Sequence, residues 1–144
     1  MKQNQTLAAP LVKEVVLDAS PARVWKALTN KDELKQWCFD MNAFVPEPGF
    51  AFEFYGEKDG HRYKHLCKVL EVEKEKRMKW LWTYEDVSGE TFVTFELFPE
   101  GDKTLLRLTH EGLENLPQDE HYAKKNFMAG WNSLLDVSLK DYLK

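Results

Sequence analysis

Apolar and polar residues alternate with a period of two through the middle of the chain, beginning at Phe50. Alternating side chains point to opposite faces of a β-strand, so these segments are predicted to bury one face. A further strand is predicted near the N-terminus from its β-branched residues. Glycine-containing turns such as Lys58-Asp59-Gly60 separate the segments and favour an antiparallel meander. The predicted strands are Leu11–Leu17, Phe50–Tyr55, His61–Glu73, Met78–Tyr84, Phe92–Phe98 and Thr104–His110.

Helical patterns flank this meander on both sides. Ser20 precedes a proline, and serine caps a helix N-terminus while proline is tolerated at the first helical position, so a helix is predicted over Pro21–Thr29. A second short helix is predicted over Lys31–Trp37, and a long one over Asp119–Tyr142. The apolar stripe of the long helix comprises Phe127, Met128, Trp131, Leu134, Leu135, Leu139 and Tyr142.

Together these elements predict an α+β fold. A long amphipathic helix buries its stripe by lying across a sheet, and strongly twisted strands curl around it. We therefore expect a curved antiparallel sheet of six to seven strands around the C-terminal helix, with two short helices after the first strand. The length of 144 residues fits a single domain over residues 11–144, preceded by a flexible segment over residues 1–10.

Composition narrows the classes of function. The net charge of −4 argues against a nucleic-acid binder, which would carry a basic field. No apolar run reaches the roughly 18 residues that a membrane helix needs, and the polar N-terminus lacks a signal peptide, so we expect a cytoplasmic protein without membrane contact. Cys38 and Cys67 fit no zinc spacing and are interpreted as semi-buried free thiols.

The segment Ser20–Thr29, together with Leu34 and Trp37, resembles the opening of the START-like (SRPBCC) superfamily. Further matches are Lys68–Val72, Leu108–Leu113 and Gly130-Trp131. Within the superfamily, the chain is similar to homologues of the C-terminal domain of the heat-shock protein 90 ATPase activator. The resemblance implies a helix-grip fold with a cavity between sheet and long helix. Superfamily members bind lipids, hormones or polyketides there, and some of them cyclise or hydroxylate what they bind.

His65 and His110 are the candidate polar groups of such a cavity. His110 follows Leu106 and Leu108 onto the inner face, where a histidine could orient a ligand carbonyl or act as an acid or base. The alternative for His110 is a hydrogen bond to the backbone of the loop after Gly112. The four histidines show no metal-ligand spacing, so no metal, cofactor or catalytic residue is predicted.

Aromatic residues supply the remaining candidates, because pockets for small apolar ligands are lined this way. Cys67 joins them, at a position where the family often has glycine. The full predicted cavity lining is Phe52, Phe54, His65, Cys67, Trp80, Trp82, Tyr84, Phe95, Leu108, His110, Phe127, Met128 and Trp131.

Three hypotheses follow. The leading one is a non-catalytic domain that encloses a small apolar molecule, lipid-like or aromatic. The second is a co-chaperone that binds heat-shock protein 90, and the third is an enzyme such as a cyclase or hydrolase. The oligomeric state is left open between monomer and homodimer, for which Phe92 and Phe98 are expected to face outward.

Overall fold

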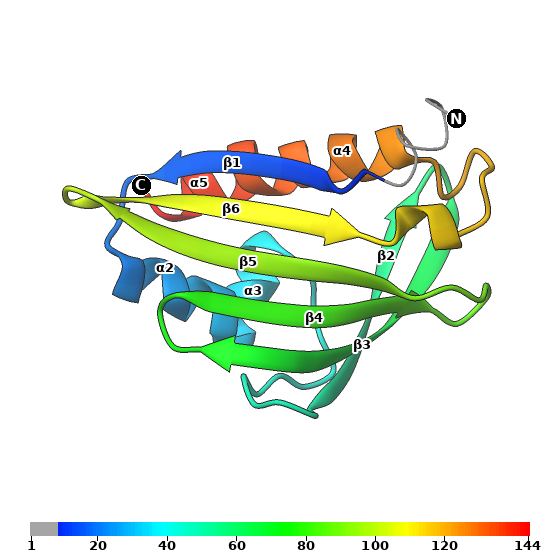
Figure 1. Ribbon diagram of the computed structural model, residues 1–144, viewed down its shortest axis with the longest axis horizontal. Coiled ribbons are helices and arrows are strands. Elements are labelled where there is room, and N and C mark those ends of the chain that lie inside the picture. The colour runs from blue at the N-terminus through cyan, green and yellow to red at the C-terminus, as the bar shows by residue number, and fades with distance from the viewer. Residues whose placement is uncertain (1–8) are drawn as a thin grey trace.

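A computed structural model describes residues 9–144, so all but the last two residues of the segment predicted to be flexible, residues 1–10, lie outside the described residues. Its centre is a six-stranded antiparallel sheet in the order β1-β6-β5-β4-β3-β2. The sheet curls along one side of the helices, and β1 lies beside the C-terminal helix (Figure 1). This confirms the predicted helix-grip architecture. The strands are β1 (Leu11–Leu17), β2 (Ala51–Lys58), β3 (His61–Glu73), β4 (Arg77–Tyr84), β5 (Thr91–Glu100) and β6 (Lys103–Glu111).

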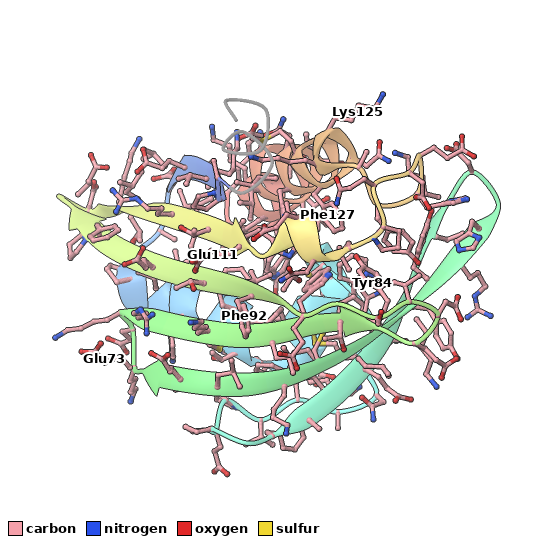
Figure 2. All side chains as sticks on the ribbon, turned by 45° about the vertical axis from the view of Figure 1, so that its right-hand side comes forward. Glu73, Tyr84, Phe92, Glu111, Lys125 and Phe127 are labelled. Atoms are coloured by element: carbon pink, nitrogen blue, oxygen red, sulfur yellow. The ribbon has the colours of Figure 1, made fainter. Side chains whose placement is uncertain are left out.

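The alternating pattern places every second side chain of a strand in the core. In β4 the buried side chains are Met78, Trp80, Trp82 and Tyr84, as the period of two predicts. On the opposite face, cationic side chains cover the two outward phenylalanines. Lys79 Nζ lies 5.1 Å from the ring centre of Phe92, which is on the outer face in Figure 2. The Arg107 guanidinium lies 4.8 Å from the ring centre of Phe98.

The β2–β3 hairpin closes through the predicted turn. Asp59 has a φ of 52° and Gly60 a φ of 80°, so both central residues are left-handed, as in the type I′ turn whose twist matches paired strands. The register that follows pairs Phe54 with His65 on β3. His65 in turn pairs with Tyr84 on β4, which brings these three side chains together on the inner face.

Two short helices follow β1 as predicted. In α2 (Pro21–Thr29), the Ser20 side chain accepts a hydrogen bond from the Arg23 backbone N–H, and proline occupies the first position. In α3 (Lys31–Trp37), Asn30 caps the N-terminus in the same way. The Trp37 indole N–H donates to the Ala27 carbonyl at 2.9 Å, which ties the two helices together.

The C-terminal helix departs from the prediction at its start. It begins at α4 (Lys124–Asn132), not at Asp119, because the Asp119 carboxylate accepts hydrogen bonds from the backbone N–H groups of His121 and Tyr122. These bonds stabilise a turn in place of a first helical turn. After α4 the chain continues as a π-helical segment, η2 (Ser133–Leu139), and ends in α5 (Lys140–Tyr142).

The π-helical segment explains how the helix buries a straight row of residues. Trp131, Leu135, Leu139 and Leu143 are all buried, at intervals of four residues. In a regular α-helix of about 3.6 residues per turn, each such step would rotate the side chain by roughly 40° away from the core. A wider turn reverses that drift. The row therefore stays on the sheet along the whole helix.

Candidate functional site

Two hollows lie between α4 and the β2, β3 and β4 strands. Their volumes are about 240 Å³ and about 130 Å³. They are joined, because they share the lining residues Phe39, His65, Tyr84, Asn126, Phe127 and Gly130. Tyr84 approaches from the sheet and Phe127 from the helix (Figure 2), with ring centres 6.5 Å apart. This joined space is called the cavity below.

The helix side of the cavity is one face of the C-terminal helix. Phe127, Gly130, Trp131 and Leu134 follow one another at the spacing of a single helical face, and all four line the inner hollow. Gly130 leaves room there, since a Cβ added to it would meet nothing within 4 Å. The missing side chain at position 130 is thus part of what keeps the cavity open.

His65 supplies the first polar group of the sheet side. Its Nδ1 lies 3.1 Å from the Tyr63 carbonyl oxygen, which can only accept, so Nδ1 carries the hydrogen. Burial lowers the pKa of His65 to about 4, against the opposing effect of the Phe54 and Tyr63 carbonyls. The ring is therefore neutral at physiological pH, and its Nε2 holds a lone pair.

Tyr84 supplies the second polar group. Its hydroxyl oxygen accepts a hydrogen bond of 3.0 Å from the Trp82 indole N–H. Among the described residues no acceptor takes the hydroxyl hydrogen of Tyr84 itself. Burial raises the pKa of Tyr84, so the hydroxyl stays protonated. The rings of His65 and Tyr84 have centres 4.7 Å apart, so the acceptor and the donor belong to neighbouring rings.

His110 lies in a closed network instead. Its Nδ1 accepts a hydrogen bond of 3.1 Å from the Trp131 indole N–H, and its Nε2 lies 2.9 Å from the Thr91 hydroxyl oxygen. That hydroxyl donates its own hydrogen to the Trp82 carbonyl, so Nε2 must be the donor. Burial lowers the pKa of His110 to about 3, and the ring is neutral. The alternative bond to the loop after Gly112 is therefore wrong: the partners are two side chains.

A polar hollow of about 370 Å³ adjoins the cavity and is called the mouth below. It shares Lys58, Tyr63, His121 and Asn126 with the outer part of the cavity. The Tyr63 hydroxyl lies 3.0 Å from His121 Nδ1, which fixes the loop before α4 against β3. Lys125 and Glu120 also line the mouth, so its charge is mixed.

The structure brings five of the predicted lining residues together around the cavity. They are His65, Trp82, Tyr84, Phe127 and Trp131. Phe52 and Cys67 line a separate hollow of about 290 Å³ near Asn42. The other predicted residues lie outside the lining of the cavity, mostly within the core: Phe54, Trp80, Phe95, Leu108, His110 and Met128.

Several lining residues escaped the sequence-based prediction. Gly130 was named only for the family resemblance, although a glycine within a helical pattern often has a packing or functional reason. Phe39 follows α3 and reaches His65, with ring centres 5.7 Å apart. His121, which was not among the predicted lining residues, lines the mouth together with Tyr63 and Asn126.

The family model described as "Activator of Hsp90 ATPase homolog 1-like protein" matches residues 18–144. The chain belongs to this family. The predicted membership is thereby confirmed. A search of the curated proteins found no match to this chain.

Solved structures of similar proteins share the fold. Protein MLL2253 from Mesorhizobium loti is 25% identical, with a TM-score of 0.78 over 94% of this chain and 96% of that one. Protein CV1439 from Chromobacterium violaceum is 22% identical, with a TM-score of 0.77 over 93% of this chain and 96% of that one. DynU16, a protein of the dynemicin biosynthetic locus, is 22% identical, with a TM-score of 0.75 over 93% of this chain and 46% of that one.

Two further searches of the described residues complete the site. Over residues 9–144, no helix combines the length and apolar character needed to cross a membrane. The same residues hold no cluster of three or more histidine, cysteine, aspartate or glutamate side chains that could bind a metal ion.

Proposed function

We propose that this chain is a binding domain that holds a small, largely apolar molecule in the cavity between α4 and strands β2–β4. The observation that carries the proposal is the joined hollow beneath Gly130, lined by the rings of Phe39, Tyr84, Phe127 and Trp131. Burial of a ligand's apolar surface there would contribute about 25 cal/mol per Å² before ordering costs.

The size of the cavity limits the ligand. The two joined hollows, of about 240 and about 130 Å³, together are only comparable with the roughly 300 Å³ at which pockets for drug-sized ligands begin. The proposed ligand is accordingly compact, such as one or two fused rings. An extended lipid chain would have to leave through the polar mouth.

The proposal assigns no chemical step to the cavity. A general acid or base works best when its pKa lies near the operating pH. Burial moves both cavity groups away from neutrality, since it lowers the pKa of His65 to about 4 and raises that of Tyr84. The arrangement therefore favours holding a ligand over a cyclase or hydrolase reaction.

Protein binding to Hsp90 is the alternative suggested by the family description. The large exposed apolar side chains lie on separate elements, with Val12 and Val16 on β1, Val45 before β2, Tyr55 on β2 and Val137 on η2. Apolar side chains are clustered around the cavity, whereas these exposed side chains lie on different elements. Ligand holding is thus the function that the geometry supports best.

The test is to fill the cavity from Gly130. Gly130→Leu should place a side chain in open space and abolish retention of a small molecule in native mass spectrometry of protein purified from its source cells. Ala129→Leu adds the same side chain at a neighbouring position that is exposed like Gly130 but lies outside the lining of the cavity, and it is the matched control. Equal ligand retention by both variants would contradict the proposal.

A further inference from the structure

The unused hydrogen-bonding groups of the cavity define the kind of ligand that it would hold. We infer that the ligand is a neutral, compact apolar molecule that carries a hydroxyl group, as a phenol does. This inference rests on the proposed function, since it specifies which molecule the same cavity binds. It is argued from three features of the lining: one acceptor, one donor and their lack of charge.

The acceptor is His65 Nε2. The Tyr63 carbonyl oxygen lies 3.1 Å from Nδ1 and accepts the ring hydrogen there, so the second nitrogen cannot donate while the ring is neutral. The ring is 5% exposed and lines both parts of the cavity. Stacking on Phe54, with ring centres 4.3 Å apart, fixes its orientation. A ligand group that donates a hydrogen bond would satisfy this lone pair.

The donor is the Tyr84 hydroxyl. It already accepts from Trp82 Nε1 and keeps its own hydrogen without an acceptor among the described residues. The residue is 7% exposed and lines both parts of the cavity. A ligand acceptor would give this hydrogen the partner that it lacks within the protein.

A hydroxyl group answers both requirements at once. Its hydrogen would be donated to His65 Nε2, and its oxygen would accept from the Tyr84 hydroxyl. The two groups belong to neighbouring rings whose centres are 4.7 Å apart. A carbonyl or ether can only accept, so it would use Tyr84 alone. An ionised ligand group would lose its hydration against a neutral histidine and a neutral tyrosine, which is unfavourable.

Four matched probes separate these possibilities by equilibrium dialysis at pH 7.5. They are 2-naphthol, 2-methoxynaphthalene, 2-methylnaphthalene and 2-naphthoate, which share a ring system and differ in one group. Tyr84→Phe should weaken the binding of 2-naphthol and 2-methoxynaphthalene by roughly five- to tenfold, which is the effect of about one hydrogen bond. The affinity for 2-methylnaphthalene should stay within about twofold of the wild-type value.

The histidine variant gives a different pattern. His65→Phe keeps an aromatic ring on Phe54 but removes the acceptor. This variant should weaken the binding of 2-naphthol by a similar factor of roughly five to ten. The affinities for 2-methoxynaphthalene and 2-methylnaphthalene should both stay within about twofold of the wild-type values. A merely structural role for either side chain would weaken all probes together. This selective pattern is therefore the signature of direct contact.

The outcomes distinguish the inference from the proposed function. If the neutral probes bind the wild-type protein but neither variant discriminates among them, the inference is wrong and the proposed function stands. Tighter binding of 2-naphthoate than of 2-naphthol would also overturn it, because the lysines at the mouth would then select the ligand head. If no probe binds the wild-type protein at concentrations up to the solubility limit of that probe, both the inference and the proposed function fail.

Discussion

Two buried histidines on the inner face of the sheet have opposite surroundings. His110 is fully buried, and both of its nitrogens are bonded, to Trp131 and Thr91. His65 is nearly as buried, but it lines the cavity, and one of its nitrogens keeps a lone pair. The first links the helix to the sheet, whereas the second belongs to a space that the two elements leave unfilled. Burial alone therefore does not separate the two histidines; their hydrogen-bond partners do.

The largest expected effect comes from removing the bonded histidine. His110→Ala leaves the Trp131 indole N–H buried without an acceptor and opens a void in the core. The free energy of unfolding should fall by about 3–4 kcal/mol. His65→Ala only enlarges a cavity that already exists, so it should cost less, about 1–2 kcal/mol. Urea unfolding followed by tryptophan fluorescence measures both values.

Equal losses of unfolding free energy in the two alanine variants would contradict the contrast between His110 and His65, because the surroundings of the two histidines would then contribute equally to stability. His110→Gln is a useful second variant, since an amide can still accept from the indole and donate to the Thr91 hydroxyl. It should recover part of the stability that His110→Ala loses. No recovery would mean that ring packing, not hydrogen bonding, is what His110 contributes.

The next largest effect is a dependence of stability on pH. Burial lowers the folded-state pKa of His110 to about 3 and that of His65 to about 4, below the value of about 6.5 in the unfolded chain. The unfolded state therefore binds more protons as the pH falls below 6.5. Each histidine should lower the free energy of unfolding by about 1.4 kcal/mol per pH unit between pH 6.5 and its folded pKa.

His110→Gln removes one of these two contributions. Between pH 7 and pH 5 its free energy of unfolding should fall by about 2 kcal/mol less than that of the wild-type protein. Urea unfolding at pH 7, 6 and 5 measures the difference between the two curves. Parallel curves would show that His110 accepts a proton in the folded state and that its network is not closed.

Much of this contrast lies beyond what the sequence can predict. Alternation along β3, β4 and β6 correctly placed His65, Tyr84 and His110 on the inner face, because side chains alternate between faces in any strand. Alternation does not say where helix and sheet separate. That separation depends on sheet curvature and on the packing of residues distant in sequence, such as Phe39 against Phe54.

The strands and the two short helices were predictable because their signals are local. Ser20 and Asn30 cap α2 and α3, and Asp59-Gly60 closes the hairpin in the conformation that those residues favour. The π-helical segment was not predictable in the same way. It depends on keeping the row from Trp131 to Leu143 against the sheet, which is a requirement of tertiary packing.

The smallest expected effect is a gain in stability, not a loss, and it concerns the cavity side of the comparison. Gly130→Ala adds a methyl group in open space and removes the helix penalty of glycine, so the protein should become more stable by about 0.8–1 kcal/mol. Ala129→Gly at the exposed neighbouring position should destabilise it by a similar amount. Thermal and urea unfolding measure both, and destabilisation by Gly130→Ala would show that the space beneath Gly130 is not open.

The same added methyl group should weaken 2-naphthol binding, because it occupies part of the cavity. A substitution that raises stability while it lowers affinity would indicate that glycine at position 130 is retained for the empty space and not for the fold. No comparable gain is expected around His110, where the side chain is fully buried and every polar partner is engaged. We therefore expect an added methyl group at Gly130 to stabilise the protein and weaken binding, whereas substitutions at His110 should destabilise it.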